Sequence, residues 1–511
     1  MYMIILLSAA CALLVLSTIL MVNTLRFSRE SSQPRGGDSH MPDPRNEPEA
    51  DFSRALDSFA LALNIASVSH SDYAQNDESV FQEFQDFLTR RYADFLEDCG
   101  VTRFGVYGIA IRWPGTEGLS RGLPLLYTAH YDVVPVDGQD WSVDPFSAEQ
   151  KEGYIWGRGT LDTKNSLIAL MEAAASLHAD GFTPRRDIWF AFGGDEETES
   201  SRGAITISRW FQEQGIRFAW TFDEGGIIAR NMIPGVQGSA ALVGVEEKGF
   251  VNFRLSAESS GGHASTPPPS TALGLVSRAV ARLEAARQPR KLIPSLRKFF
   301  RRTVPYQSLP LKIVMANLWL FAPVVKQVLA GGDDSRAMIQ STLAPTMAGG
   351  SSKENVLPAA AWANINVRIL PGETIDQVRR RCIRIIRDPR VEVSIANSAE
   401  ANDPISSSPP AKEDTGSPGT AGVDRFLAFC ADALSFREGF TTALPYLMTG
   451  ATDSKHYAHI SDHVFRFVPM ELDSRELSRI HNPDERISLE NFRGMLAFYR
   501  YNLKYHERVF Q

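Results

Sequence analysis

The chain has 511 residues, of which 43% are hydrophobic and 22% charged, a composition typical of a globular protein that excludes a disordered or fibrous chain. With 53 Lys and Arg against 60 Asp and Glu, the net charge is −7, which argues against a surface given over to nucleic acid, so no nucleic-acid partner is expected. The 4 cysteines contain no Cys-x-x-Cys pair and predict neither a disulfide framework nor a thiolate metal site.

An uncharged apolar run covers residues 3–23. About 20 such residues are enough for a helix to cross a bilayer. A cleaved signal peptide usually has a shorter apolar region after a basic start, and no Lys or Arg precedes this run. We therefore expect an uncleaved, single-pass membrane anchor, followed by a flexible linker over 24–50 that is rich in Pro, Gly, Ser and charge.

The charges beside the apolar run say less about the side of the membrane on which the rest of the chain lies. Arg26, Arg29 and Arg35 follow the apolar run, and the positive-inside rule alone would place them in the cytoplasm, with Glu30 opposing this modest bias. We nevertheless expect the rest of the chain on the periplasmic, extracellular or lumenal side. A secreted protein is the alternative if the N-terminal segment is cleaved.

Beyond the linker, strands alternate with helices. Apolar segments at 123–134, 187–192 and 218–222 read as buried strands, and 165–177 has the apolar spacing of a helix. This alternation predicts an α/β fold with a mostly parallel sheet. Ligands of such sheets bind beyond the carboxyl ends of the strands.

Acidic and imidazole groups collect at these strand ends. They occur in His130-Tyr131-Asp132, in the Gly-rich turn that ends at Asp162, in Asp195-Glu196-Glu197 and in Asp223-Glu224. Imidazole and oxygen ligands without cysteine suit a catalytic zinc site, or less selectively manganese or cobalt. Each piece alone is weak: His-x-Asp also occurs at His70 and His178, and the glutamate pair could be an ordinary acidic loop. Their order and their Gly-rich turns favour the functional interpretation.

Taken together, these motifs resemble the M20 family of metallopeptidases, in particular the branch of carboxypeptidase S, Gly-Xaa carboxypeptidase and the N-fatty-acyl-amino-acid synthase/hydrolases. The resemblance runs in the family order from about residue 50 to the C-terminus. The matching stretches are TAHYDVVPV, WSVDPFSAE, GYIWGRGTLDTK, FGGDEETE, TFDEGG, GGHASTP, ENVLP, VRILPGE, TGATDSKHY and IHNPDE.

The resemblance implies an α/β zinc-peptidase catalytic domain interrupted by a smaller α/β lid, or dimerisation, domain. On this basis we expect the first part of the catalytic domain at 51–244, the lid at 245–396 and the second catalytic part at 397–511. The lid carries an insertion at about 287–330 that is similar to one in the carboxypeptidase S branch.

The resemblance also implies two zinc ions per subunit, with manganese or cobalt as substitutes. A bridging carboxylate suits two dications about 4 Å apart. The ligands that it implies are His130, Asp162, Glu197, Asp223 and His481, with Asp162 as the bridge, His130 and Asp223 on the first ion, and Glu197 and His481 on the second.

Three further residues carry implied catalytic roles. Asp132 would fix the tautomer of the His130 imidazole, and Glu196 would act as general base. In the lid, His263 resembles the family histidine that reaches the active site of a partner subunit and stabilises the oxyanion, which implies a homodimer through the lid.

Four residues are implied in substrate binding: Asn355, Arg368, Ser454 and Lys455. A guanidinium such as that of Arg368 suits the free carboxylate of a substrate. A turn asparagine and a solvated strand-end arginine are the structural alternatives for Asn355 and Arg368. Relatives often carry Arg in place of Lys455 and Gly in place of Ala451, which concerns specificity.

Three segments need a separate interpretation. His456, His459 and His463 could suggest another metal site, but a partly buried or solvated cluster fits their surroundings better, so His481 is preferred. The insertion, with its basic stretch 297–302 before apolar 311–329, could be packed helices or could contact lipid headgroups or an acyl chain. Residues 398–422 are rich in Ser, Pro and Asp, a composition that predicts a mobile surface loop.

The sequence thus predicts a membrane-anchored di-zinc metallohydrolase that cleaves the amide next to a free C-terminal amino acid, acting as a carboxypeptidase on small peptides or N-acyl amino acids. An N-fatty-acyl-amino-acid amidohydrolase/synthase or an aminoacylase is the alternative enzyme. An inactive peptidase-like membrane scaffold is the non-enzyme alternative.

Overall fold

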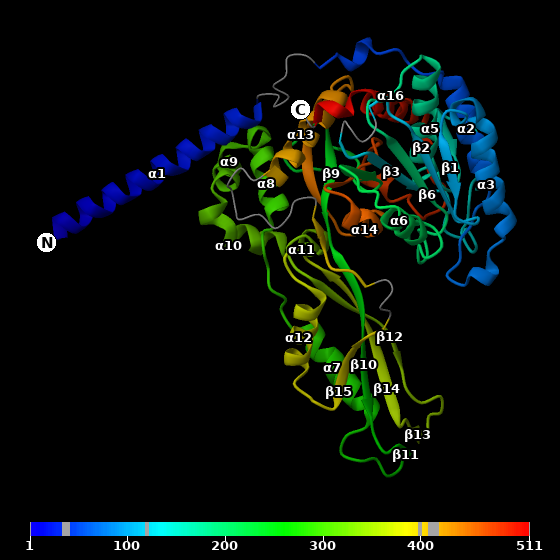
Figure 1. The fold of residues 1–511 in the computed structure, drawn as a ribbon. Helices are drawn as coiled ribbons and strands as arrows, with labels where there is room; N and C mark the ends of the chain where they lie inside the picture. The colour runs from blue at the N-terminus through cyan, green and yellow to red at the C-terminus, as the bar shows by residue number, and fades with distance from the viewer. Residues whose placement is uncertain (1, 33–40, 118–121, 397–400, 407–417, 510–511) are drawn as a thin grey trace.

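The computed structural model describes residues 2–32, 41–117, 122–396, 401–406 and 418–509. A body built on an 11-stranded sheet carries a projecting four-stranded sheet, and a long N-terminal helix extends from its other side (Figure 1). The principal strand order of the large sheet is β1 (Gly100–Arg103), β2 (Gly108–Trp113), β6 (Ile188–Gly193), β3 (Leu125–His130), β7 (Trp220–Asp223), β18 (Val464–Arg466), β9 (Ser239–Glu247), β8 (Ile228–Arg230) and β19 (Glu471–Leu472).

The four central strands, β6, β3, β7 and β18, are parallel to one another. Their register places His130 opposite Gly193, and Asp223 opposite Arg466, so their carboxyl ends meet at one edge. The flanks are antiparallel, from β1 to β6 on one side and from β18 through β9 to β8 on the other. The α/β fold is confirmed; the sheet is mixed, and it is parallel where the candidate site lies.

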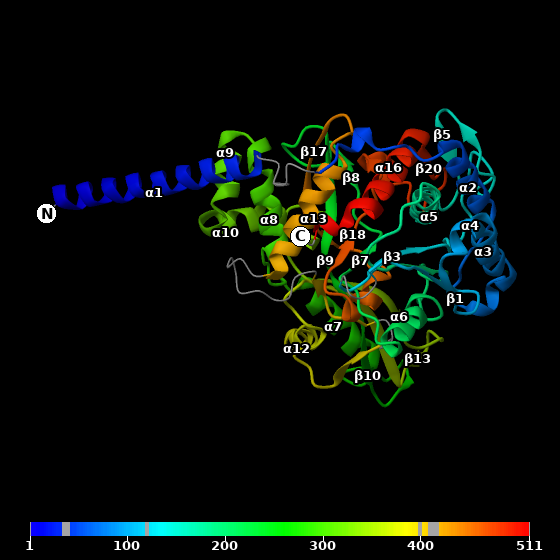
Figure 2. The same cartoon turned by 45° about the horizontal axis from the view of Figure 1, so that its top comes forward.

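Helices cover both faces of the large sheet (Figure 2). One face packs against a core contributed by α2 (Phe52–Asn64), α3 (Glu78–Arg91), α5 (Lys164–Ala179), α13 (Pro418–Ala433) and α16 (Leu489–Tyr505). Phe426 of α13 stacks on Phe465 of β18 with ring centroids 3.9 Å apart. The opposite face packs against α6 (Ala204–Glu213) and the short α14 (Ser454–Tyr457). These two layers fix the central strands, and with them the loops at their carboxyl ends.

The smaller sheet is antiparallel throughout, in the order β12 (Thr342–Gly349), β14 (Ala360–Ile369), β10 (Gly249–Glu258) and β15 (Val391–Ile395). With α7 (Ala272–Ala285) and α12 (Ile375–Ile386) it buries a separate hydrophobic core. Only Lys248 separates β9 of the large sheet from β10 of the small one. The chain therefore changes sheets within the 245–396 segment at Lys248, and we call the small sheet with its helices the lid.

The expected insertion forms three helices, α8 (Pro294–Thr303), α9 (Leu309–Ala316) and α10 (Leu318–Leu329). These helices pack away from the lid core. Leu296 and Phe300 of α8 join Leu318 and Leu447 in a buried cluster, and Leu447 belongs to β17 (Phe440–Met448), which pairs with β9. The insertion is thus anchored on the body, beside the N-terminal helix (Figure 1).

The segment expected as a linker over 24–50 differs from a free stalk. The N-terminal helix α1 runs from Tyr2 to Ser32, and residues 33–40 lie outside the described part. The stretch that follows is fastened to α16: the Tyr501 hydroxyl donates to the Pro42 carbonyl at 2.9 Å, and Lys504 pairs with Glu47 at 2.7 Å. Of the predicted loop 398–422, residues 398–400 and 407–417 lie outside the described residues as well.

A buried ion pair joins two distant loops at the carboxyl edge of the sheet. Arg158 and Glu485 are 1% and 0% exposed, and the guanidinium Nη1 lies 2.6 Å from the carboxylate. The same carboxylate accepts hydrogen bonds from the backbone N–H groups of Gly159 and Leu161, at 3.1 and 2.7 Å. Glu485 therefore holds the loop that leads to Asp162 against the loop that carries His481.

We expect Arg158→Met to lower the free energy of unfolding by about 3–5 kcal/mol, because it leaves the Glu485 carboxylate buried without its cation. The loss is measured as a fall in the denaturation midpoint of the full-length protein. The matched control is Arg380→Met, which removes an exposed helical pair with Asp376 and should cost about 0.5 kcal/mol. Adding Glu485→Gln to Arg158→Met should recover part of the loss; equal shifts for the two single variants would contradict the assignment.

Candidate metal centre

The candidate centre lies where three parallel strands end. His130 is the last residue of β3, Glu196 and Glu197 follow β6, and Glu224 follows β7. Asp162 lies in the Gly-rich loop that precedes α5. Because these strands are parallel and adjacent, segments up to about 100 residues apart in the chain reach one buried rim.

Asp162 lies between the two imidazoles of the centre. One of its carboxylate oxygens is 3.1 Å from His130 Nε2, and the other is 3.1 Å from His481 Nε2. The same nitrogen of His481 is 3.0 Å from a carboxylate oxygen of Glu197. His130, Asp162 and Glu197 thus present ligand atoms close enough for one metal ion, with His481 beside them. A carboxylate that uses both oxygens in this way has the geometry of a bridging ligand.

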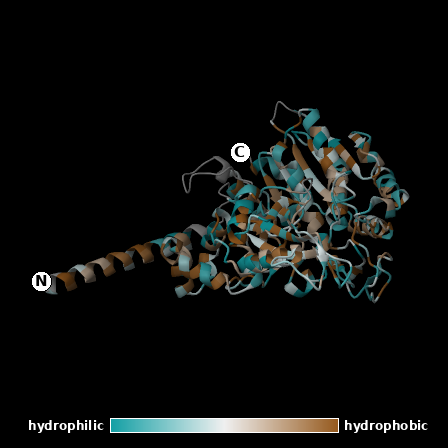
Figure 3. Ribbon diagram, turned by 90° about the horizontal axis from the view of Figure 1, so that it is seen from below, coloured by the Kyte–Doolittle hydropathy of each residue, from teal (hydrophilic) through white to brown (hydrophobic). Residues whose placement is uncertain are grey.

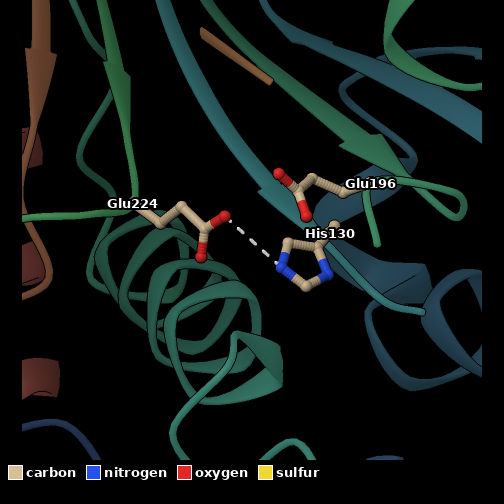
Figure 4. Close-up of side chains that lie close together, drawn as sticks. All are labelled: His130, Glu196 and Glu224. Carbon is tan, nitrogen blue, oxygen red and sulfur yellow. Dashed lines mark ion pairs between the residues drawn. The ribbon is translucent and has the colours of Figure 1, made fainter. Parts of the chain in front are cut away.

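A second group shares His130 and adds the glutamates of the neighbouring strands. The ligand atoms of His130, Glu196 and Glu224 also lie within 4.8 Å of one another. Glu224 is the nearer partner, with 3.4 Å between its oxygen and His130 Nε2. The dashed line in Figure 4 marks this ion pair. His130 is therefore common to two adjoining sets of possible metal ligands.

Asp223, the expected ligand of the first ion, has one of its two carboxylate oxygens in a hydrogen bond. It is the last residue of β7, and its carboxylate accepts a hydrogen bond from the backbone N–H of Ser454 at 2.7 Å. Neighbouring residues of a strand point to opposite faces, so Glu224, one position later, projects toward His130. The sequence interpretation assigned no role to Glu224, although its place directly after a buried strand was the available signal. The ligand role of Asp223 stays a prediction.

Asp132 contacts both the His130 imidazole and the backbone of the glutamate pair. Its carboxylate lies 3.3 Å from His130 Nδ1 and accepts the backbone N–H groups of Glu196 and Glu197, each at 3.1 Å. Ser69 donates a further hydrogen bond at 2.7 Å. One fully buried carboxylate thus contacts the imidazole and the backbone of the glutamate pair together.

The pKa values of the centre reflect crowded negative charge. Burial raises the pKa of Glu196 and Glu224 well above the usual range, and neighbouring carboxylates raise them further. Burial also raises the pKa of Glu197. Hydrogen bonds with Asp162 and Glu197 raise the pKa of His481 to about 10. A cation placed among these groups would relieve the repulsion between them.

Around Asp162 and His130, hydrogen bonding and charge outweigh burial. Burial alone would raise the pKa of Asp162, but hydrogen bonds from His130 and His481 hold it below its usual range. Burial alone would lower the pKa of His130, but the charge of Glu224 and the hydrogen bonds to Asp132 and Asp162 raise it well above the usual value. Imidazole nitrogens and carboxylate oxygens without a thiolate are a donor set that fits a divalent metal such as zinc, manganese or cobalt.

The lid residues expected at the site lie at opposite ends of the lid. His263 is exposed on β11 (Gly262–His263), which pairs with β13 (Val356–Leu357) at the far tip of the lid (Figure 1). Asn355 is its neighbour there, since its carbonyl accepts from the N–H of Ala264 at 3.0 Å. Arg368 lies at the base, 4.7 Å from the ring of Phe250. In this chain, neither His263 nor Asn355 is brought to the centre.

The guanidinium of Arg368 is poorly satisfied. Burial lowers its pKa, opposed by the charge of Glu247, and its Nη1 is buried without a hydrogen-bond partner among the described residues. Ser454, by contrast, is fully occupied: its N–H donates to Asp223, and its hydroxyl accepts from Arg466 Nε at 2.8 Å. Lys455 follows it on the same short helix, partly exposed.

The competing histidines remain outside the centre. His456 is half-buried, and the burial of its imidazole lowers its pKa to about 3, while His459 Nε2 lies 3.1 Å from the side-chain oxygen of Gln212. His463 stacks on Phe465 with centroids 5.9 Å apart. In the described part of the chain, none of the three belongs to a group that could hold a metal ion, whereas His481 lies beside Asp162 and Glu197.

The sequence matches the model of the peptidase family M20/M25/M40 over residues 126–504. The N-fatty-acyl-amino acid synthase/hydrolase PM20D1 of Xenopus tropicalis is 32% identical over 457 residues, which cover 88% of this chain and 85% of that protein. A probable carboxypeptidase S-like protein of Dictyostelium discoideum is 31% identical, with 96% and 92% of the two chains covered.

Solved structures show the same fold. The M20 family metallo-carboxypeptidase Sso-CP2 of Sulfolobus solfataricus superposes with a TM-score of 0.60 at 15% identity, covering 88% of this chain and 98% of that one. Human carnosine dipeptidase 1 gives a TM-score of 0.56 at 14% identity, with 90% and 97% covered. The chain, with a cluster of side chains at the strand ends that could hold a metal ion, belongs to the M20 family of metal-dependent hydrolases that act on amide bonds.

Proposed function

We propose that the protein is a di-zinc hydrolase that cleaves the amide next to a free C-terminal amino acid, in small peptides or in N-acyl amino acids. The observation that carries this proposal is the position of Asp162, whose two oxygens face His130 on one side and His481 on the other. One bridging carboxylate between two imidazoles suits a pair of divalent ions rather than a single one.

Glu197 and His481 would hold one ion, and His130 the other, with Asp162 shared. Asp223 would complete the set at His130 through the carboxylate oxygen that does not accept the N–H of Ser454. Glu224, 3.4 Å from the imidazole, is a further carboxylate beside the same ion. When bound, such ions polarise the substrate carbonyl and lower the pKa of a water molecule toward about 7.

Glu196 would move the proton. Its carboxylate lies beside His130 and Glu224, and burial, reinforced by the surrounding carboxylates, raises its pKa well above the usual range. A buried carboxylate beside the metal ligands is placed to accept a proton from water first and then to donate it to the leaving nitrogen. Asp132 keeps it in place through the backbone N–H of Glu196 and of its neighbour Glu197.

Arg368 would recognise the free carboxylate of the substrate. Its buried, unsatisfied Nη1 offers a charged donor near the junction of lid and body, and a guanidinium fork matches a carboxylate. Both kinds of sequence relative, N-fatty-acyl-amino acid synthase/hydrolases and carboxypeptidase S-like proteins, have names that place a free carboxylate beside the amide. The alternative enzyme is therefore an N-fatty-acyl-amino-acid amidohydrolase/synthase or an aminoacylase, which differs in the acyl group.

His263 and Asn355 would act on the substrate of a partner subunit. Both lie together at the exposed tip of the lid, away from the metal centre of their own subunit. In a homodimer formed through the lid, this tip would reach the metal centre of the partner subunit. Ser454 would support Asp223, and Lys455 would face the substrate at the neighbouring position.

The enzyme would be held at a membrane by α1. The segment Ile5–Arg29 is long and apolar enough to cross a bilayer, a property shared with signal sequences. An uncleaved α1 is favoured over a cleaved signal sequence because α1 is hydrogen-bonded to the body, where Asn317 donates to the Leu20 carbonyl at 3.1 Å. We place the catalytic body on the extracellular, periplasmic or lumenal side. The alternative of an inactive membrane scaffold is disfavoured by the complete set of donors around Asp162.

Replacing Glu196 with Gln tests the proposed reaction. The full-length enzyme should release the C-terminal amino acid from small peptides or N-acyl amino acids, and Glu196→Gln should reduce kcat by about 10² to 10⁴ while leaving the metal content unchanged. Substrates with an amidated C-terminus are the matched controls and should be poor. Equal cleavage of free and amidated substrates, or full activity of Glu196→Gln, would contradict the proposal.

Replacing His481 or His459 with Ala separates a ligand from a surface histidine. His481→Ala should remove most of the metal from one position, measured by elemental analysis, and abolish most of the activity. His459→Ala, which loses only a partly exposed contact to Gln212, should keep both. Comparable losses in the two variants would undo the assignment.

Mixing two inactive variants tests the homodimer. His263→Ala and Glu196→Gln subunits should each form inactive dimers. After subunit exchange at equal amounts, about a quarter of wild-type activity should return, because half of the dimers then hold one complete site in two. If His263→Ala is fully active, or if mixing restores nothing, the proposed role of His263 across the dimer is wrong.

A further inference from the structure

Helices α9 and α10 expose an apolar surface beside the N-terminal helix. The two helices are bent by 109° at the break between them. Their exposed hydrophobic side chains, here called the platform, are Leu309, Leu311, Trp319, Leu320, Val324 and Val328, which are between 39% and 72% exposed. Leu320, Val324 and Val328 recur every four residues and so share one face of α10. This apolar stripe, with Leu309, Leu311 and Trp319 on the adjoining turns, marks an interaction surface rather than a scatter of single residues.

The platform is fixed to α1 by a polar contact. Asn317, at the bend between α9 and α10, is fully buried and donates to the carbonyl of Leu20 at 3.1 Å. Its side-chain oxygen accepts from Asn23 Nδ2 at 2.9 Å, and Thr24 is only 2% exposed at the same junction. These bonds hold the platform at a defined height along α1.

That height corresponds to the edge of a bilayer. Leu20 lies 18 residues beyond Tyr2, which at ~1.5 Å per residue is about 27 Å, close to the about 30 Å thickness of the hydrocarbon core. Figure 3 shows hydrophobic residues along the projecting part of α1, up to the point where it meets the body. If α1 spans the membrane, the platform lies at the body-side boundary of the hydrocarbon. Trp319, an indole with an apolar ring and one N–H, belongs to the residue types that collect there.

Positive charge borders the platform. Arg287, Arg290 and Lys326 line a cavity of about 380 Å³ on the side of α10 next to its apolar face, and the described residues that line this cavity include no acidic side chain. Arg290 donates to Gln327 at 3.0 Å, which holds it at the cavity wall. Cations beside an apolar face are the arrangement that binds anionic headgroups while the face enters the acyl boundary.

We propose that the platform is a second membrane-binding element, which lies in the interfacial layer of a bilayer with anionic headgroups in the cavity of Arg287, Arg290 and Lys326. This inference rests on α1 being a retained membrane anchor, as in the proposed function. A lipid surface is favoured over a second copy of the chain because the platform is continuous with the apolar part of α1 and carries cations at its border. The anchor and the platform together hold the body against the membrane at a fixed angle.

Spin labels on the full-length protein in lipid nanodiscs test this surface. In a background of Cys11→Ser and Cys99→Ser, which leaves only the buried Cys382 and Cys430, labels are placed at Val328→Cys on the platform, at Leu14→Cys on α1, and at Val101→Cys on the edge strand β1 as the matched exposed control. Collisions with oxygen, which partitions into lipid, are compared with collisions with a water-soluble nickel complex. We expect oxygen to dominate at positions 328 and 14 and nickel to dominate at position 101.

The outcomes separate the platform from the anchor. Nickel dominance at 328 with oxygen dominance at 14 would overturn the platform and leave the anchor intact, whereas nickel dominance at both would remove the anchor on which the inference rests. Protection of 328 from both reagents would indicate a protein partner and also overturn the proposal.

The cavity is tested by changing the lipid and the charge together. Nanodiscs of phosphatidylcholine with added phosphatidylglycerol should draw the 328 label deeper than phosphatidylcholine alone. Arg287→Gln with Lys326→Gln should abolish this difference while the label stays in lipid. The same depth in both lipids for the unsubstituted cavity would refute the binding of anionic headgroups.

Discussion

Crowded negative charge at the carboxyl edge of the large sheet is the constraint on which the rest of the structure depends. Asp132, Asp162, Glu196, Glu197 and Glu224 meet there around two imidazoles, and burial raises the pKa of all three glutamates. Uncompensated burial of so many carboxylates is costly, and a cation bound among them would lower that cost. A divalent metal centre is the physical solution that also supplies hydrolytic chemistry.

The strands and buried contacts around the centre hold the carboxylates and imidazoles at that edge of the sheet. Parallel pairing of β6, β3 and β7 brings three strand ends together, and Asp132 fixes one imidazole and two glutamates from below. The Arg158–Glu485 pair then brings in the loop of His481, more than 300 residues away from the loop of Asp162. Each fastening is buried, which makes the centre rigid before any substrate arrives.

The lid and the insertion pack against different parts of the molecule. The lid sheet continues from β9 through a single residue, so its base carries Arg368 close to the body while its tip carries His263 far from it. The insertion packs on β17 and α1 rather than on the lid core, which leaves the lid a separate unit and places the apolar platform beside α1. The lid and the platform are therefore different parts of the chain.

By itself, the sequence determined the α/β fold and the apolar N-terminal helix, because alternating apolar segments and a long uncharged run are local signals. The expected grouping of His130, Asp162, Glu196, Glu197 and His481 came from the resemblance of the ordered motifs to the M20 family. Only the tertiary structure showed what the two carboxylates at the end of β7 contact. Asp223 accepts the N–H of Ser454, while Glu224 faces His130. The tertiary structure also decided that α1 continues to Ser32 and is bonded to Asn317, and that the insertion packs on the body. Side-chain direction at a strand end and the packing of distant helices depend on contacts between remote segments, which no local pattern encodes.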